Sequence, residues 1–272
     1  PGRLLRLGGP ARPPGDLAFP PGIQHLGRHQ CYGDPQFTLP EGGITTADWR
    51  PSFHHPTMVV TELRNLVSRA RNLRLHTTAA LGDDLDRIVE AIPGSWLDRS
   101  DVAEALGLVQ GELGRLDQAP SYLERTVRCD RPQASVASQE KWGNYRARLS
   151  NRTWLDVDRA VEDPEEREAR RAERLQELEA AIGRIEALID LFGPTTERLN
   201  LLGSANKRKS PVAPVRERMS VRGEAQDQYR EARRHALEST GVEDFLSLTN
   251  CMAISVVRRL RGGGSPADDV EF

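Results

Sequence analysis

The stretch "GRLDQAPSYLERTVRCDRP", residues 114–132, carries the spacing that decides the predicted fold. It predicts a helix that begins at Asp117, with Pro120 in the first turn, where a residue without a backbone N–H costs little. A small, a large and a small side chain then follow one another at steps of four and three residues, at Ala119, Leu123 and Thr126. Small residues let two antiparallel helices approach closely, and the larger residue one turn later fills the gap. The stretch therefore predicts the second helix of a helical hairpin.

Related spacings recur along the chain. Each pairs a glycine in one predicted helix with a triplet at four-then-three spacing in the next. The sets are Gly107 with Ala119, Leu123 and Thr126; Gly203 with Ala225, Tyr229 and Ala232; and, more weakly, Gly143 with Ala181, Ile185 and Leu188. A hairpin of this kind leaves apolar surface exposed until another hairpin stacks on it. The recurrence therefore predicts a stack of hairpins.

This arrangement resembles the tetratricopeptide repeat (TPR), a helical hairpin of about 34 residues. The resemblance is fair over residues 101–132, partial over 195–238 and degenerate over 134–194. The segment "ERLNLLGSANKR", residues 197–208, is also similar to closing repeats of the TPR regions that accompany bacterial CHAT-type, caspase-like peptidases. Because the His and Cys motif of such a peptidase is not visible in the sequence, the resemblance implies a regulatory or docking module. A generic helical bundle with coincidental spacing is the alternative architecture.

The sequence predicts three regions that differ in composition and expected structure. Residues 1–56 hold 10 of the 18 prolines and 9 of the 23 glycines, which predicts an irregular Pro/Gly-rich N-terminal arm. Residues 57–261 are expected to form the TPR-like α-helical domain, and residues 262–272 a flexible acidic tail. The predicted fold class is thus mostly α, an α-solenoid of antiparallel helical hairpins preceded by the arm.

Helix boundaries follow from apolar periodicity and from start and stop residues. Besides the helix that begins at Asp117, helices are predicted over 57–75, 82–92, 100–113, 134–150, 164–192, about 195–209, 223–238 and 244–260. The residue pairs Asp83-Asp84 and Glu165-Glu166 are interpreted as first-turn carboxylates that interact with the helix dipole. The helix at 164–192 also has a periodicity compatible with a coiled coil.

Composition limits the classes of function. The net charge is −2, so no global basic field indicates nucleic acid or a membrane surface as the partner. Cys31, Cys129 and Cys251 form no C-x-x-C pair, which fits a reducing compartment. We therefore expect a cytoplasmic protein with no membrane partner. Because the sequence begins with Pro1 rather than Met, a fragment of a longer polypeptide is one interpretation, which the sequence leaves open.

The sequence contains only weak candidates for catalytic, metal-binding or cofactor-binding residues. His25, His29 and Cys31 are good zinc ligands by type, but their spacing matches no common zinc template, so loop residues are the preferred interpretation. Cys251 lies in an apolar predicted helix and is expected to be buried. The segment "GSANKRKS", residues 203–210, lacks the second glycine that a phosphate-binding loop requires. We therefore expect no cofactor, no bound metal and no catalytic activity.

The TPR resemblance implies a ligand site on the concave surface, which is lined by the first helix of each hairpin. The partner-binding residues that it implies are Glu104, Asn144, Asn200, Ser204, Lys207 and Arg208. The first residue of this set, Glu104, is acidic, and the last two, Lys207 and Arg208, are basic. Such a set suits a protein or peptide ligand of mixed charge, including a peptidase domain encoded with the chain. The alternatives are nucleic-acid binding by the basic segments at 206–210 and 257–264, and a zinc or enzymatic module in the arm. Residues 1–56 could also occupy the surface themselves.

Overall fold

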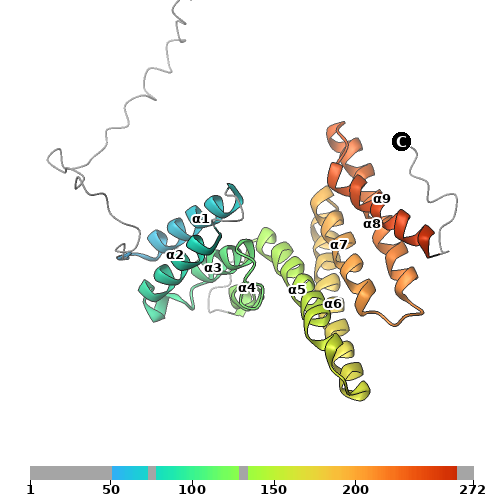
Figure 1. The fold of residues 1–272 in the computed structure, drawn as a ribbon. Coiled ribbons are helices and arrows are strands. Elements are labelled where there is room, and N and C mark those ends of the chain that lie inside the picture. Colours follow the sequence, from blue (N-terminus) through green and yellow to red (C-terminus); the bar gives the residue numbers. More distant parts are fainter. Residues whose placement is uncertain (1–50, 73–77, 129–133, 262–272) are drawn as a thin grey trace, which may run out of the picture. The chain divides into compact units, whose positions relative to one another are not determined.

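The computed structural model describes residues 51–72, 78–128 and 134–261, and every regular element in these ranges is a helix (Figure 1). The α-helices are α1 (Pro56–Asn72), α2 (Thr78–Ala91), α3 (Ser100–Glu112), α4 (Ala119–Arg128), α5 (Val136–Asp156), α6 (Pro164–Phe192), α7 (Thr196–Val212), α8 (Arg218–Thr240) and α9 (Phe245–Leu260). Two 3₁₀ helices, η3 (Gly94–Trp96) and η4 (Asp158–Ala160), complete the described elements. The predicted mostly α class is confirmed for these ranges, whereas residues 1–50 and the predicted tail lie outside them.

Helix α6 has the bounds that the sequence predicts. It begins at Pro164 because the Asp163 side chain accepts a hydrogen bond from the Glu165 backbone N–H, at 3.0 Å. It ends at Phe192, because the next residue, Gly193, has a φ of 80° that suits glycine, and Pro194 follows. Local capping chemistry therefore fixes both ends of this helix.

Helix α2 corrects one prediction. It begins at Thr78, four residues before the predicted start, because the strong helix formers Ala79 and Ala80 extend it. Asp84 consequently lies inside the helix, and the first-turn interpretation of the acidic pair is wrong. The Asp84 carboxylate instead forms ion pairs with Arg69, at 2.9 Å, and Arg87, at 2.6 Å.

Three further helices are longer than predicted. Helix α5 continues past residue 150 to Asp156, and this extension buries Trp154. Helix α7 passes through Pro211 to Val212, which is fully buried. Helix α8 begins at Arg218 instead of residue 223. In α5 and α7, burial of apolar side chains outweighs the weaker local sequence signals.

Three hairpins have the same close contact, at the glycines that the spacing identified. A Cβ on Gly107 would lie 2.6 Å from Cγ of Leu123, one on Gly143 would lie 2.9 Å from Cγ1 of Ile185, and one on Gly203 would lie 3.2 Å from Cδ2 of Tyr229. Each glycine lies eight positions after the N-cap residue of its helix, which is Arg99, Ser135 or Thr195. The pairings α3 with α4, α5 with α6 and α7 with α8 therefore share one register.

Alternate helices are joined by polar contacts. Between α5 and α7 these are Glu140 with Arg198 at 2.7 Å, Lys141 with Glu197 at 3.2 Å, and Asn151 with the Arg208 carbonyl at 2.9 Å. Between α7 and α9 they are Asn200 with Asp244 and with Ser247, each at 2.8 Å, and Lys207 with Asn250 at 2.5 Å. Because residue numbers rise together in each pair of helices, α5, α7 and α9 run in the same direction side by side.

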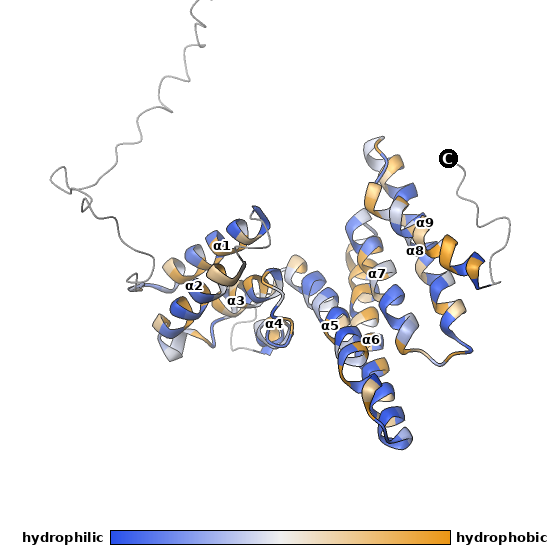
Figure 2. Ribbon diagram, in the orientation of Figure 1, coloured by the Kyte–Doolittle hydropathy of each residue, from blue (hydrophilic) through white to orange (hydrophobic). Residues whose placement is uncertain are grey.

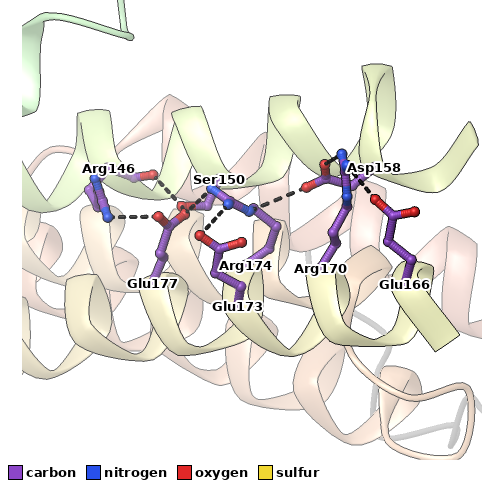
Figure 3. A network of polar contacts seen from close by, with 8 residues as sticks. All are labelled: Arg146, Ser150, Asp158, Glu166, Arg170, Glu173, Arg174 and Glu177. Carbon is purple, nitrogen blue, oxygen red and sulfur yellow. Dashed lines mark hydrogen bonds and ion pairs between the residues drawn. The ribbon is translucent and has the colours of Figure 1, made fainter. Parts of the chain in front are cut away.

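A polar network attaches α6 to α5 and η4 (Figure 3). At its centre Asp158, which is 3% exposed, forms ion pairs with Arg170, at 3.3 Å, and Arg174, at 3.2 Å. Arg174 also pairs with Glu177, whose carboxylate accepts hydrogen bonds from Arg146 and Ser150, each at 2.7 Å. Because the buried carboxylate is paired with arginines, we assign this network to stability.

Gly111 provides a test of close packing, because a Cβ there would overlap the buried ring of Tyr145 on α5. We expect Gly111→Ala to lower the free energy of unfolding by about 1–2 kcal/mol, since overpacking outweighs the gain in helix propensity. Gly183→Ala in α6 is the matched control, because nothing lies within 4 Å of its Cβ position. The control should raise the free energy of unfolding by about 0.5–1 kcal/mol. Urea denaturation measures both, and equal changes in the two variants would contradict the packing argument.

Candidate functional site

A cavity of about 690 Å³ is lined mainly by α5, α7 and the start of α9. Its polar side chains are spaced three or four residues apart, so that each helix presents them on one face. They include Lys141, Asn144 and Arg148 on α5, and Asn200, Ser204 and Arg208 on α7. Leu246 and Asn250 of α9 complete this wall. We call this cavity the α5–α7–α9 groove.

The structure brings together most of the residues that the sequence singled out for partner binding. Asn144, Asn200, Ser204 and Arg208 line the groove, and Lys207 contacts the lining residue Asn250. Glu104 is not among the lining residues. Its carboxylate accepts a hydrogen bond from Ser135, the N-cap residue of α5, which gives it a structural contact between α3 and α5.

Tyr229 of α8 also lines the groove, and the sequence analysis assigned it only a packing role. The ring is 1% exposed and packs against Gly203, where a side chain would collide with it. The Nζ atom of Lys207 lies 5.8 Å from the ring centroid, within reach of a cation–π interaction. Burial raises the pKa of the Tyr229 hydroxyl, so the ring stays neutral. The hairpin contact between α7 and α8 thus also shapes the groove.

Three cationic side chains lie close together on the later turns of α5 and α7. Within the described ranges, Arg148, Lys207 and Arg208 form no ion pair with a carboxylate. Arg208 donates to the carbonyl and hydroxyl oxygens of Ser204, at 3.1 and 2.5 Å. Burial lowers the pKa of Arg208, and the charge of Arg148 lowers it further. Burial and the charge of Arg208 lower the pKa of Lys207 in the same way, so the cluster favours a bound anion.

The opposite end of the groove carries carboxylates. Glu197 lies in the first turn of α7 and pairs with Lys141, and Asp244 caps α9 by accepting a hydrogen bond from the Ser247 backbone N–H at 2.9 Å. Asn200 uses its amide to join α7 to α9 and is 8% exposed. Because the helices are parallel, their N-terminal ends place the acids together and their later turns place the cations together.

Two groove residues have polar groups that no protein group satisfies in the described part of the chain. The Asn144 amide and the Arg148 guanidinium make no hydrogen bond there. They lie four residues apart on α5 and are half-buried. The sequence analysis did not name Arg148, although its spacing of four residues from Asn144 could have indicated it. Asn250 carried no comparable signal, since its place depends on how α9 packs beside α7.

The other candidate sites gain no support. Among the described residues, no group of three His, Cys, Asp or Glu side chains could hold a metal ion, and His25, His29 and Cys31 lie outside these ranges. Cys251 is buried at 2% exposure, as the sequence predicts. In the same ranges no helix has the length and apolar character needed to cross a membrane. Comparisons with protein-family models, curated proteins and solved structures found no match.

The Asp244 cap predicts a pH dependence. Burial raises the pKa of Asp244, but hydrogen bonds from Ser247 and Asn200 outweigh it and hold the pKa below its ordinary value. A carboxyl group whose pKa is lower in the folded state than in the unfolded state stabilises the fold at pH values above its ordinary pKa. This contribution is lost as the pH falls through the folded-state pKa. We expect Asp244→Ala to lower the free energy of unfolding by about 1 kcal/mol at neutral pH. The deficit should shrink on acidification.

Urea unfolding at neutral pH and near pH ~3 measures this change. Asp227→Ala is the control, because Asp227 is exposed and, among the residues that the structure describes, pairs only with Arg230 three positions along α8. A deficit in Asp244→Ala that does not depend on pH would contradict the proposed role of the charged carboxylate.

Proposed function

We propose that this chain is a non-catalytic protein-interaction module that binds an extended, carboxylate-bearing peptide segment in the α5–α7–α9 groove. The observation that carries the proposal is the cluster of Arg148, Lys207 and Arg208, which has no carboxylate partner in the described ranges. Burying positive charge without a partner costs free energy, and a bound anion recovers part of it. A carboxylate ligand has the matching charge and geometry for the two guanidinium groups.

The rest of the groove favours a peptide over an isolated anion. Its volume of about 690 Å³ is in the range of sites that enclose ligands of several residues or of drug size. The free amide of Asn144 can both donate to and accept from a peptide backbone. Glu197 and Asp244 at the acidic end suit a basic group further along the same peptide. The proposed ligand therefore carries opposite charges at its two ends.

The helical architecture supports the same proposal. We propose that the shared glycine register and the parallel course of α5, α7 and α9 reflect a TPR-type α-solenoid. In such a stack the first helix of each hairpin lines the ligand surface, which would include α3 as well. We extend the proposal to a cytoplasmic, regulatory role beside a caspase-like peptidase domain, which rests on the sequence resemblance alone.

The basic segment at 206–210 gives less support to nucleic-acid binding. Arg208 lines the groove, whereas the neighbouring Lys209 pairs with Glu179 on α6 at 3.1 Å. Arg258 of the second basic segment donates to Gln226 at 2.6 Å. The two segments thus spread their cations over several contacts instead of one phosphate-binding surface.

A peptide array with free C-termini tests the proposal directly. We expect the wild-type chain to retain peptides enriched in Asp and Glu, and Arg148→Glu/Arg208→Glu to weaken their binding about tenfold or more, because charge attraction becomes repulsion. Lys209→Glu is the matched control, because it reverses a charge next to Arg208 but outside the groove lining, and it should retain the same peptides.

Three results would contradict the proposal. The first is peptide binding that the double variant does not change, and the second is enrichment of basic peptides. The third is retention of a single-stranded oligonucleotide in preference to every peptide, with a steep dependence on salt, which would favour nucleic acid as the ligand. Circular dichroism of each variant confirms that the helices are intact.

A further inference from the structure

Helix α9 has an apolar outer face that no helix in the described ranges covers. Its buried residues, including Ser247, Cys251 and Ile254, lie on one side of the helix. On the opposite side and its flanks, large apolar side chains are between 36% and 82% exposed: Phe245, Leu246, Met252, Val256, Val257 and Leu260. Figure 2 shows the orange, hydrophobic stretches of α9. A contiguous apolar face of this kind is typical of an interaction surface.

This face differs from the faces that form the hairpins. In α3, α5 and α7 the eighth position after the N-cap is a glycine, which allows the next helix to approach closely. In α9 the N-cap is Asp244, and the eighth position is Met252. A methionine there keeps a partner helix at an ordinary packing distance. The face therefore does not fit the same close hairpin partner.

The pattern on α9 is complementary to itself. When two copies of α9 pack antiparallel about an axis between positions 252 and 253, Phe245 lies opposite Leu260 of the second copy. Met252 then lies opposite Ala253 of the second copy, so a large side chain meets a small one. Thr249 would lie opposite Val256, and its hydroxyl is already satisfied by the Phe245 carbonyl at 2.9 Å. Leu246 lies opposite Arg259, whose aliphatic stem can cover it, and the other apolar positions of the stripe meet uncharged neighbours.

Charge favours the same orientation. The chain entering α9 carries Glu243 and Asp244, and the last turn and the following residue carry Arg259 and Arg261. Antiparallel packing places the acidic end of each copy beside the basic end of the other, whereas parallel packing places like charges together. The helix dipoles give the same preference.

We propose that a second copy of this chain covers the outer face of α9, so that two α9 helices pack antiparallel in a two-fold symmetric dimer. Leu246 and Asn250 both line the groove, so the proposed dimer lies at the edge of each groove and shares Leu246 with its wall. A pair of 16-residue helices would bury roughly 1,000 Å² in total, below the range of stable interfaces and in that of weak, transient ones. The dimer is therefore expected to dissociate on dilution in the micromolar range.

Sedimentation velocity across micromolar concentrations tests the dimer. The full chain should shift from monomer to dimer as concentration rises, and Val256→Glu should remain monomeric. Val215→Glu adds the same charge at a residue that is 73% exposed between α7 and α8, and it should behave like the wild type. Circular dichroism distinguishes loss of the dimer from loss of the fold. A wild-type chain that stays monomeric overturns the proposal, as does a dimer that Val256→Glu leaves intact.

Disulfide cross-linking tests the register in a chain whose Cys31 and Cys129 are replaced by serine. Met252→Cys should form a cross-linked dimer on oxidation, because position 252 lies next to the two-fold axis. Phe245→Cys should cross-link to a chain carrying Leu260→Cys and not to itself. Self-cross-linking of Phe245→Cys in preference to the mixed pair would overturn the antiparallel arrangement.

Discussion

The contact between a helical glycine and a large side chain of the next helix is the constraint on which the fold depends. At Gly107, Gly143 and Gly203 the missing side chain lets Leu123, Ile185 and Tyr229 fill the space between two helices. Because these glycines share one position relative to the N-cap, the three hairpins repeat one packing solution. Neighbouring hairpins are then joined by contacts such as that of Tyr145 on Gly111. Repetition of a local contact thereby orders the whole array.

The groove follows from the same contact. Gly203 allows Tyr229 to pack against α7 and line the groove, and the parallel course of α5 and α7 brings their later turns together. Cations at those turns become half-buried beside one another, and the described residues supply no carboxylate to pair with them. Helix α9 is the last helix of this series among the described residues. With Met252 at the glycine position, it offers an apolar face to another molecule instead of a hairpin partner.

The sequence predicted what local chemistry determines. The Asp163 cap and Gly193 fixed the bounds of α6, and the four-then-three spacings identified the glycine contacts within three hairpins. They did not identify the closer contact of Gly111 with Tyr145. The sequence-based prediction failed where burial in the tertiary structure or a longer run of helix-forming residues sets the end of a helix. Examples are Pro211 inside α7 and the early start of α2. Of the groove lining, the sequence analysis named only Asn144 on α5 and Asn200, Ser204 and Arg208 on α7, and it missed Lys141 and Arg148. The groove's wall from α9 depends on contacts between residues more than 40 positions apart, such as Lys207 with Asn250, and single-sequence spacing carries no signal for these.

The pKa of the Lys207 ammonium group, measured by NMR titration of the free protein, tests the central claim most directly. An uncompensated cation cluster in a half-buried groove predicts a pKa below the ordinary value of 10.5, because burial and the charge of Arg208 both oppose protonation. The pKa should rise when an acidic peptide binds. A pKa at or above the ordinary value in the free protein would mean that a carboxylate already neutralises the cluster, and it would contradict the account.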